Sequence, residues 1–182
     1  RLSLAFVGEL VAEQLAIEAI HRIVRGLSSV ALRSALARDF DVVSAPPLLS
    51  ASAVLPKLVS MGRLLWVESL ERAWWLVPKP GAFAGVRELD GAWLEHTLAG
   101  TGAVLDYQHG VADVLDVVRA DPTATAILIR PTSLAEIERT AREGLLMPPK
   151  STFFTPKLRT GLVLRPLDDS DSDRDDSDRG DS

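Results

Sequence analysis

The stretch TAILIRPTSLAE, residues 125–136, decides the fold expected for this chain. Its first part, Thr125–Ile129, is apolar or β-branched at consecutive positions, a pattern typical of a strand that is buried on both faces. Pro131 ends this strand, because proline has no backbone donor to continue a ladder. Ser133 and Glu136 then have the spacing of a capping box, which predicts a helix start. The stretch therefore predicts a central strand that runs directly into a helix.

Further strands and helices are expected on both sides of this stretch. The expected strands span residues 2–7, 14–20, 40–43, 64–68, 72–77, 103–107 and 162–164. The expected helices begin at Ser29, at Ser50 or Ser52, after an N-cap at Asp90, near Val111 and after Ser133. The first two strands and the pair 64–68 and 72–77 are spaced as antiparallel hairpins. Together these elements predict an α+β fold: a mixed sheet with hairpins, strand–helix–strand crossovers and about five helices.

Composition and charge divide the chain at about residue 167. Residues 1–167 suit a single α+β domain of ordinary size. Residues 168–182 hold eight Asp and two Arg with no apolar residue, which predicts a disordered acidic tail. The formal charge of the tail is −6 and that of the whole chain is −5, so residues 1–167 are nearly neutral. These residues have no basic stripe that would bind a nucleic acid. The absence of cysteine fits a cytoplasmic protein, and the apolar runs are too short to span a membrane.

The beginning of the sequence indicates a longer protein. The chain opens with Arg1 and runs at once into the apolar segment Leu2–Val7. We therefore expect a missing N-terminal half of the same protein to be a partner of this domain.

Cationic and hydroxyl side chains around the last crossover predict an anion site. Arg130 follows the central strand, at the kind of strand end where ligands of α/β sheets bind. The Ser133 helix offers free amides at its start. Four further candidates come from the Pro-rich loop 147–157, namely Lys150, Ser151, Thr152 and Lys157. The loop lacks the glycines of a P-loop, so its prolines and lysines are equally compatible with a braced, solvated connection.

Three histidines are the candidates for acid–base chemistry. His21 lies with Arg22 after the second expected strand, His96 lies within a helix, and His109 precedes Gly110 at a helix start. We take His21 and His109 as candidate catalytic residues. No spacing among the histidines suggests a metal site.

Several short motifs follow one another along the chain: Ile20–Arg22, Leu94–His96, Tyr107 with His109, Ile129–Pro131, and Met147–Lys157 with Gly161–Leu164. In this order they resemble the closing part of an uncharacterised conserved family of bacteria and archaea, domain of unknown function 1015. One departure is Gly110, which stands where the family commonly has an acidic residue.

The resemblance implies a function that the motifs alone do not give. Family members are longer and carry an upstream Gly-His-His-Arg motif that resembles the active-site segment of ParB-like and sulfiredoxin-like folds, which include nucleotide-dependent kinases of small molecules. By this resemblance, the chain supplies the half of a phosphotransferase-like enzyme that binds a small phosphate or carboxylate anion. Arg22, Arg130 and the lysines of the loop would bind that anion, His109 or His21 would lie near the transferred group, and a nucleotide is the implied cofactor. The alternative is a non-catalytic regulatory, ligand-binding or structural domain.

Overall fold

A computed structural model describes residues 16–46, 54–62 and 64–155, which we call the described residues. The strands expected at residues 2–7 and 162–164, the helix caps at Ser50 or Ser52, Lys157 and the acidic tail lie outside them.

Six strands form the main sheet, in the order β3-β5-β4-β7-β2-β6. They are β2 (Ile20–Arg25), β3 (Phe40–Ala45), β4 (Leu64–Val67), β5 (Ala73–Pro78), β6 (Val104–His109) and β7 (Thr125–Leu128). The position of β7 confirms the prediction from its sequence: it lies inside the sheet between β4 and β2, and all four of its residues are buried. The edge strand β6 has a mostly exposed surface, because it has a neighbour on one side only.

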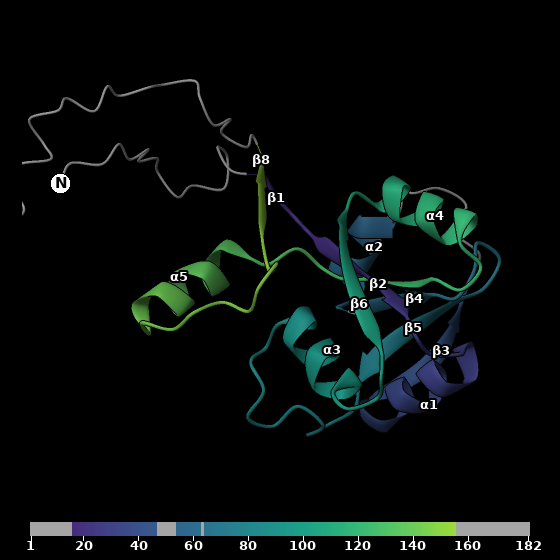
Figure 1. Cartoon of the computed structure of the whole chain (residues 1–182). Coiled ribbons are helices and arrows are strands. Elements are labelled where there is room, and N and C mark those ends of the chain that lie inside the picture. Colours follow the sequence, from purple (N-terminus) through teal and green to yellow (C-terminus); the bar gives the residue numbers. More distant parts are fainter. Residues whose placement is uncertain (1–15, 47–53, 63, 156–182) are drawn as a thin grey trace, which may run out of the picture.

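Helices cover both faces of this sheet (Figure 1). The five helices of the described residues are α1 (Ser29–Asp39), α2 (Val54–Met61), α3 (Asp90–Leu98), α4 (Val111–Ala120) and α5 (Leu134–Arg142). One apolar core joins α2 and α4 to the sheet, and a second core joins α1 and α3 to the other face. The α+β class with five helices is therefore confirmed. No helix in the described part of the chain is long and apolar enough to cross a bilayer.

Strand directions explain how hairpins and crossovers combine. The expected hairpin of β4 and β5 forms, with Leu64 opposite Leu76 and Val67 opposite Ala73. The crossovers through α1, α2, α3 and α4 each join two strands of like direction, as expected. One strand lies between the two strands that α2 joins and between the two that α4 joins, and three strands lie between those that α1 or α3 joins. Strands of like direction are therefore never neighbours, and all strand pairs of the described residues are antiparallel, where a mixed sheet was expected.

A strand forms inside the second segment of the first expected hairpin, but it is shorter than predicted: β1 (Ala16–Glu18) ends before Ala19, and β2 begins at Ile20. The partner predicted for it, residues 2–7, lies outside the described residues. Within them, β1 pairs with β8 (Phe153–Thr155), a strand inside the segment predicted to be a loop. His21 and Arg22 consequently lie within β2 rather than after a strand. The β1–β8 pair and α5 extend from one end of the main sheet, as Figure 1 shows.

Candidate functional site

A cavity of about 700 Å³ opens where β7 ends and β2 begins. The lining residues used below are Arg22, Asp90, Gly91, Arg130, Ser133 and Ser151. They come from β2, the start of α3, the connection from β7 to α5, and the segment before β8. The cavity is of the size that accommodates a small-molecule ligand.

Asp90 and Arg130 form a closed ion pair in the wall of this cavity. The Asp90 carboxylate is 2.6 Å from Arg130 Nη2 and 3.1 Å from Arg130 Nε, and it also accepts the Arg130 backbone N–H at 2.8 Å. These hydrogen bonds, together with the nearby charge, raise the pKa of Arg130 above its ordinary value. The predicted N-cap role of Asp90 is wrong. Leu89 is the N-cap, and Asp90 is the first helical residue, with its carboxylate directed to Arg130.

The start of α3 consequently has no side-chain cap. The first amides of a helix have no partner within the helix, and they carry its partial positive charge. Gly91, the second residue of α3, lies directly against Arg22: a Cβ added at Gly91 would be 2.7 Å from Arg22 Nη2. The absence of a side chain at Gly91 therefore lets a guanidinium approach the helix start.

Arg22 is the most unusual side chain of the cavity. It is fully buried, with an exposed fraction of 0%. Its Nη1 donates to the Ile20 carbonyl, and its guanidinium lies 4.6 Å from the centre of the Tyr107 ring. Its Nε and Nη2 have no hydrogen-bond partner among the described residues. Burial lowers the pKa of Arg22 from its ordinary value. The nearby Tyr107 and Glu95 raise this pKa and so offset part of the effect of burial. An arginine remains cationic under ordinary conditions, so this is a buried, incompletely paired charge.

The two arginines of the cavity differ in one respect that bears on chemistry. Nε and Nη2 form one edge of the guanidinium fork, which matches the two oxygens of a carboxylate or phosphate. In Arg130 this edge binds Asp90. In Arg22 the same edge has no partner among residues 16–46, 54–62 and 64–155. Arg22 can therefore bind an oxyanion in the way that Arg130 binds Asp90.

His21 lies on the opposite face of β2 from Arg22, because successive strand residues alternate between faces. It is buried, and its Nδ1 accepts the backbone N–H of Ile129 at 3.2 Å. Burial, with a smaller contribution from Arg22, lowers the pKa of His21 to about 4. His21 is therefore neutral at pH 7, and only its Nε2 is available for a further contact.

His109 ends β6 and lies opposite Ile20 of β2. Its ring stacks on Phe153 with a centroid distance of 4.4 Å, and its Nδ1 is 4.0 Å from a Glu18 carboxylate oxygen. These contacts link the β1–β8 pair to the edge of the main sheet. His109 is not among the residues that line the cavity.

The described part of the Pro-rich segment, residues 147–155, contributes one residue to the cavity, Ser151. The Ser151 hydroxyl donates to the Pro148 carbonyl at 2.7 Å, and the Thr132 hydroxyl donates to the Ser151 carbonyl at 2.8 Å. These bonds fix the segment beside the start of α5. Lys150 is exposed, with a φ of 58°, and Thr152 is half-buried; neither lines the cavity.

The structure thus brings Arg22, Arg130, Ser133 and Ser151 to one cavity, and it leaves Lys150, Thr152 and both candidate histidines outside its lining. Sequence reasoning missed the contribution of Gly91. The available signal was a glycine at the first position of a predicted helix, where it weakens the helix unless close packing requires it. Within the described ranges, no group of three or more His, Cys, Asp or Glu could hold a metal ion.

The fold and the cavity define an α+β domain with a buried arginine at a helix start, and this fold has known counterparts. A free serine kinase mutant in complex with ADP matches with a TM-score of 0.55 and 10% identity, over 82% of this chain and 58% of that chain. A free serine kinase mutant in complex with AMP matches with a TM-score of 0.56 and 10% identity, over 80% of this chain and 56% of that chain. The free serine kinase in complex with AMP matches with a TM-score of 0.52 and 9% identity, over 82% of this chain and 57% of that chain.

These matches show a shared fold, and this chain spans less than three fifths of the length of the kinases. No family model and no curated protein matches the chain.

Proposed function

We propose that this chain is the anion-binding half of a small-molecule phosphotransferase, and that the anion is a phosphate group of a nucleotide. The observation that carries the proposal is the buried, unpartnered Nε–Nη2 edge of Arg22, a residue that lines the cavity and lies beside the uncapped start of α3. A buried guanidinium edge without a partner is costly to a folded protein, and a bound phosphate would satisfy it.

Two further features support a phosphate as the ligand. The amides at the start of α3 add donors and a positive partial charge on the same side as Arg22. Two of the three carboxylates that line the cavity are paired within the protein, Asp90 with Arg130 and Glu136 with Arg87 and Arg139, and the third, Glu88, is exposed. The free serine kinases of like fold are recorded in complex with ADP and AMP, which favours a nucleotide as the source of the phosphate.

Membership of the domain of unknown function 1015 family is part of this proposal. In that family a Gly-His-His-Arg motif, which resembles the active-site segment of ParB-like and sulfiredoxin-like folds, lies upstream of the segment that corresponds to this chain. The proposal therefore assigns phosphate binding to this half, with a second half supplying the chemistry.

Binding of ADP by the full chain tests the proposal. We expect calorimetric titration to give a saturable signal for ADP and AMP. Gly91→Ala should weaken ADP binding at least tenfold, because the new Cβ would displace the Arg22 guanidinium. Lys150→Ala serves as the control, because it removes an exposed cation outside the cavity. Unchanged affinity in Gly91→Ala, or an equal loss in Lys150→Ala, would contradict a site at Arg22.

A non-catalytic ligand-binding domain is the second candidate, and one observation favours it. His21 is the only candidate base next to Arg22 in sequence, and its Nδ1 already accepts the Ile129 amide. A longer native protein that binds ADP, yet transfers no phosphate from it to a small hydroxylated acceptor such as free serine, would support this alternative. Transfer by the longer protein, with loss of transfer in Gly91→Ala, would exclude it.

A further inference from the structure

A second cavity lies at the opposite end of the sheet from Arg22. It has a volume of about 750 Å³ and is lined by the connection from β2 to α1, the β4–β5 turn, the end of α4 and the start of β7. Thr125 begins β7 in this cavity, whereas Arg130 follows β7 at the first one. Five residues of extended chain separate these two ends by about 17 Å. The second cavity is therefore a separate place on the molecule.

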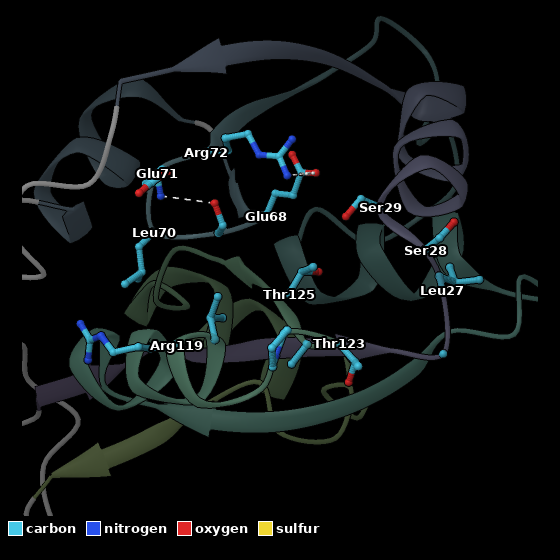
Figure 2. A pocket seen from close by; sticks show the side chains of 15 residues that line it. Leu27, Ser28, Ser29, Glu68, Leu70, Glu71, Arg72, Arg119, Thr123 and Thr125 are labelled. Carbon is cyan, nitrogen blue, oxygen red and sulfur yellow. Dashed lines mark hydrogen bonds and ion pairs between the residues drawn. The ribbon is translucent and has the colours of Figure 1, made fainter.

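Thr125 is an unpartnered polar side chain in this cavity. It is 7% exposed, and its hydroxyl oxygen has no hydrogen-bond partner in the described part of the chain. Figure 2 shows Thr125 in the middle of a ring of side chains, with Ser28 and Ser29 on one side and Leu70 on the other. A buried hydroxyl normally has a partner, either a water or a bound group, so this one is available to a ligand.

Hydroxyls and amides surround Thr125 with further donors. The Ser28 hydroxyl accepts the Ala31 amide at 3.2 Å and caps α1, and the Ser69 hydroxyl accepts the Glu71 amide at 3.3 Å. A hydroxyl that accepts one hydrogen bond still has its own hydrogen to donate. The first turn of α1, a helix of 11 residues, contains no acidic side chain to compensate its positive end.

Two carboxylates, Glu68 and the exposed Glu71, and two guanidiniums, those of Arg72 and Arg119, carry the charges of this cavity. Glu68 accepts from Trp74 Nε1 at 3.0 Å and pairs with Arg72 at 3.2 Å, so its carboxylate is largely satisfied. The guanidiniums of Arg72 and Arg119 are both more than half exposed and retain further N–H groups. Donors thus converge from the α1 start, from the β4–β5 turn and from Thr125. Several directions of approach suit the tetrahedral oxygens of a phosphate better than a planar carboxylate.

We propose that this cavity is a second binding site, independent of the proposed function, for the phosphate group of a small phosphorylated metabolite. The amides at the start of α1, the hydroxyls of Ser28, Ser29 and Thr125, and Arg72 contact the phosphate. The remaining volume takes the organic part of the ligand. Because the two cavities lie at opposite ends of β7, this site holds its ligand while the first one is blocked.

Calorimetric titration of inorganic phosphate into the full chain tests this site, in a Gly91→Ala background that removes the contribution of Arg22. We expect one phosphate to bind per chain. Thr125→Val keeps the shape of the side chain and removes the hydroxyl, and Arg72→Gln removes the charge. Each should raise the dissociation constant for phosphate about tenfold. Arg142→Gln is the matched control, because Arg142 is likewise an exposed arginine paired with a glutamate four residues away, Glu138.

Several outcomes would overturn the proposal. No binding of phosphate in the Gly91→Ala background would do so, as would unchanged affinity in both Thr125→Val and Arg72→Gln. Acetate bound as tightly as phosphate would reject the phosphate class. If Thr125→Val does not fold, Ser29→Ala replaces it, and an affinity within twofold of the background in both Ser29→Ala and Arg72→Gln would count against the site.

Discussion

The two ends of β7 differ in how they treat buried polar groups. At the end marked by Arg130, a complete ion pair with Asp90 lies beside Arg22, a charge whose Nε and Nη2 have no partner among the described residues. At the end marked by Thr125, the Glu68 carboxylate is hydrogen-bonded, and it lines the same cavity as the neutral Thr125 hydroxyl. That hydroxyl also has no hydrogen-bond partner among the described residues. An unpaired buried charge costs a folded protein more than an unpaired hydroxyl. The comparison indicates that the unpartnered group at the Arg22 end lowers the stability of the unliganded protein more than the one at the Thr125 end does. A ligand that pairs with it would therefore stabilise the Arg22 end more.

Breaking the complete ion pair should cause the largest loss of stability. Asp90→Ala removes every carboxylate contact to Arg130, including the one to its backbone amide. Arg130 is 30% exposed, so water can compensate in part. We expect the free energy of unfolding to fall by about 3 kcal/mol, measured by urea denaturation. Asp90→Asn should lower the free energy of unfolding less than Asp90→Ala does, because the side-chain oxygen of asparagine can still accept a hydrogen bond from the Arg130 backbone N–H. Equal stability of Asp90→Ala and the native chain would show that the pair does not hold this end together.

Acid should destabilise the same end through His21. The folded-state pKa of His21 is about 4, lowered from 6.5. Between these values the unfolded chain binds a proton that the folded chain does not, so stability falls as the pH falls from about 6.5 to about 4. The slope from this residue approaches about 1.4 kcal/mol per pH unit inside the window, and it vanishes above it.

His21→Asn isolates this contribution, because an asparagine oxygen can accept the Ile129 amide in place of Nδ1 but does not titrate. Denaturation curves at several pH values should be flatter for His21→Asn than for the native chain below pH 6.5. Identical curves would mean that His21 protonates as readily in the folded protein as in the unfolded one.

Removal of the unpaired hydroxyl should have the smallest effect, with the opposite sign. Thr125→Val replaces a buried group without a partner by a methyl group of the same shape, at a β-strand position that favours valine. We expect the unliganded protein to gain about 1 kcal/mol. A loss of stability, measured under the same conditions, would show that the hydroxyl already has a partner and would weaken the comparison.

Local signals in the sequence predicted much of the main sheet. The buried run of β7, the N-cap at Ser133 and the β4–β5 hairpin each depend on neighbouring residues, and the structure contains all three. The predicted capping box forms only in its Ser133 half, because the Glu136 carboxylate binds Arg87 and Arg139. The five helices and the α+β class follow from the same kind of pattern.

Contacts between distant residues account for what the sequence did not predict. The pairing of β1 with β8 joins three-residue strands more than 130 positions apart, which no local pattern indicates. Asp90 has the local signature of an N-cap, yet a cation 40 residues away, Arg130, offers its carboxylate stronger, charge-assisted hydrogen bonds. The contact of Gly91 with Arg22 is of the same kind. The site residues could thus be found singly, but their convergence depends on the fold.

The comparison is tested most directly by Arg22→Met, with the stability of the full chain measured in the absence and presence of ADP. Removing an unpaired buried cation should leave the free energy of unfolding in the absence of ligand unchanged or raise it, by up to about 4 kcal/mol. The stabilisation that ADP gives to the native chain should disappear in Arg22→Met. A variant that is less stable without ligand, yet still stabilised by ADP to the native extent, would contradict the claim that Arg22 is held unpaired to bind a phosphate.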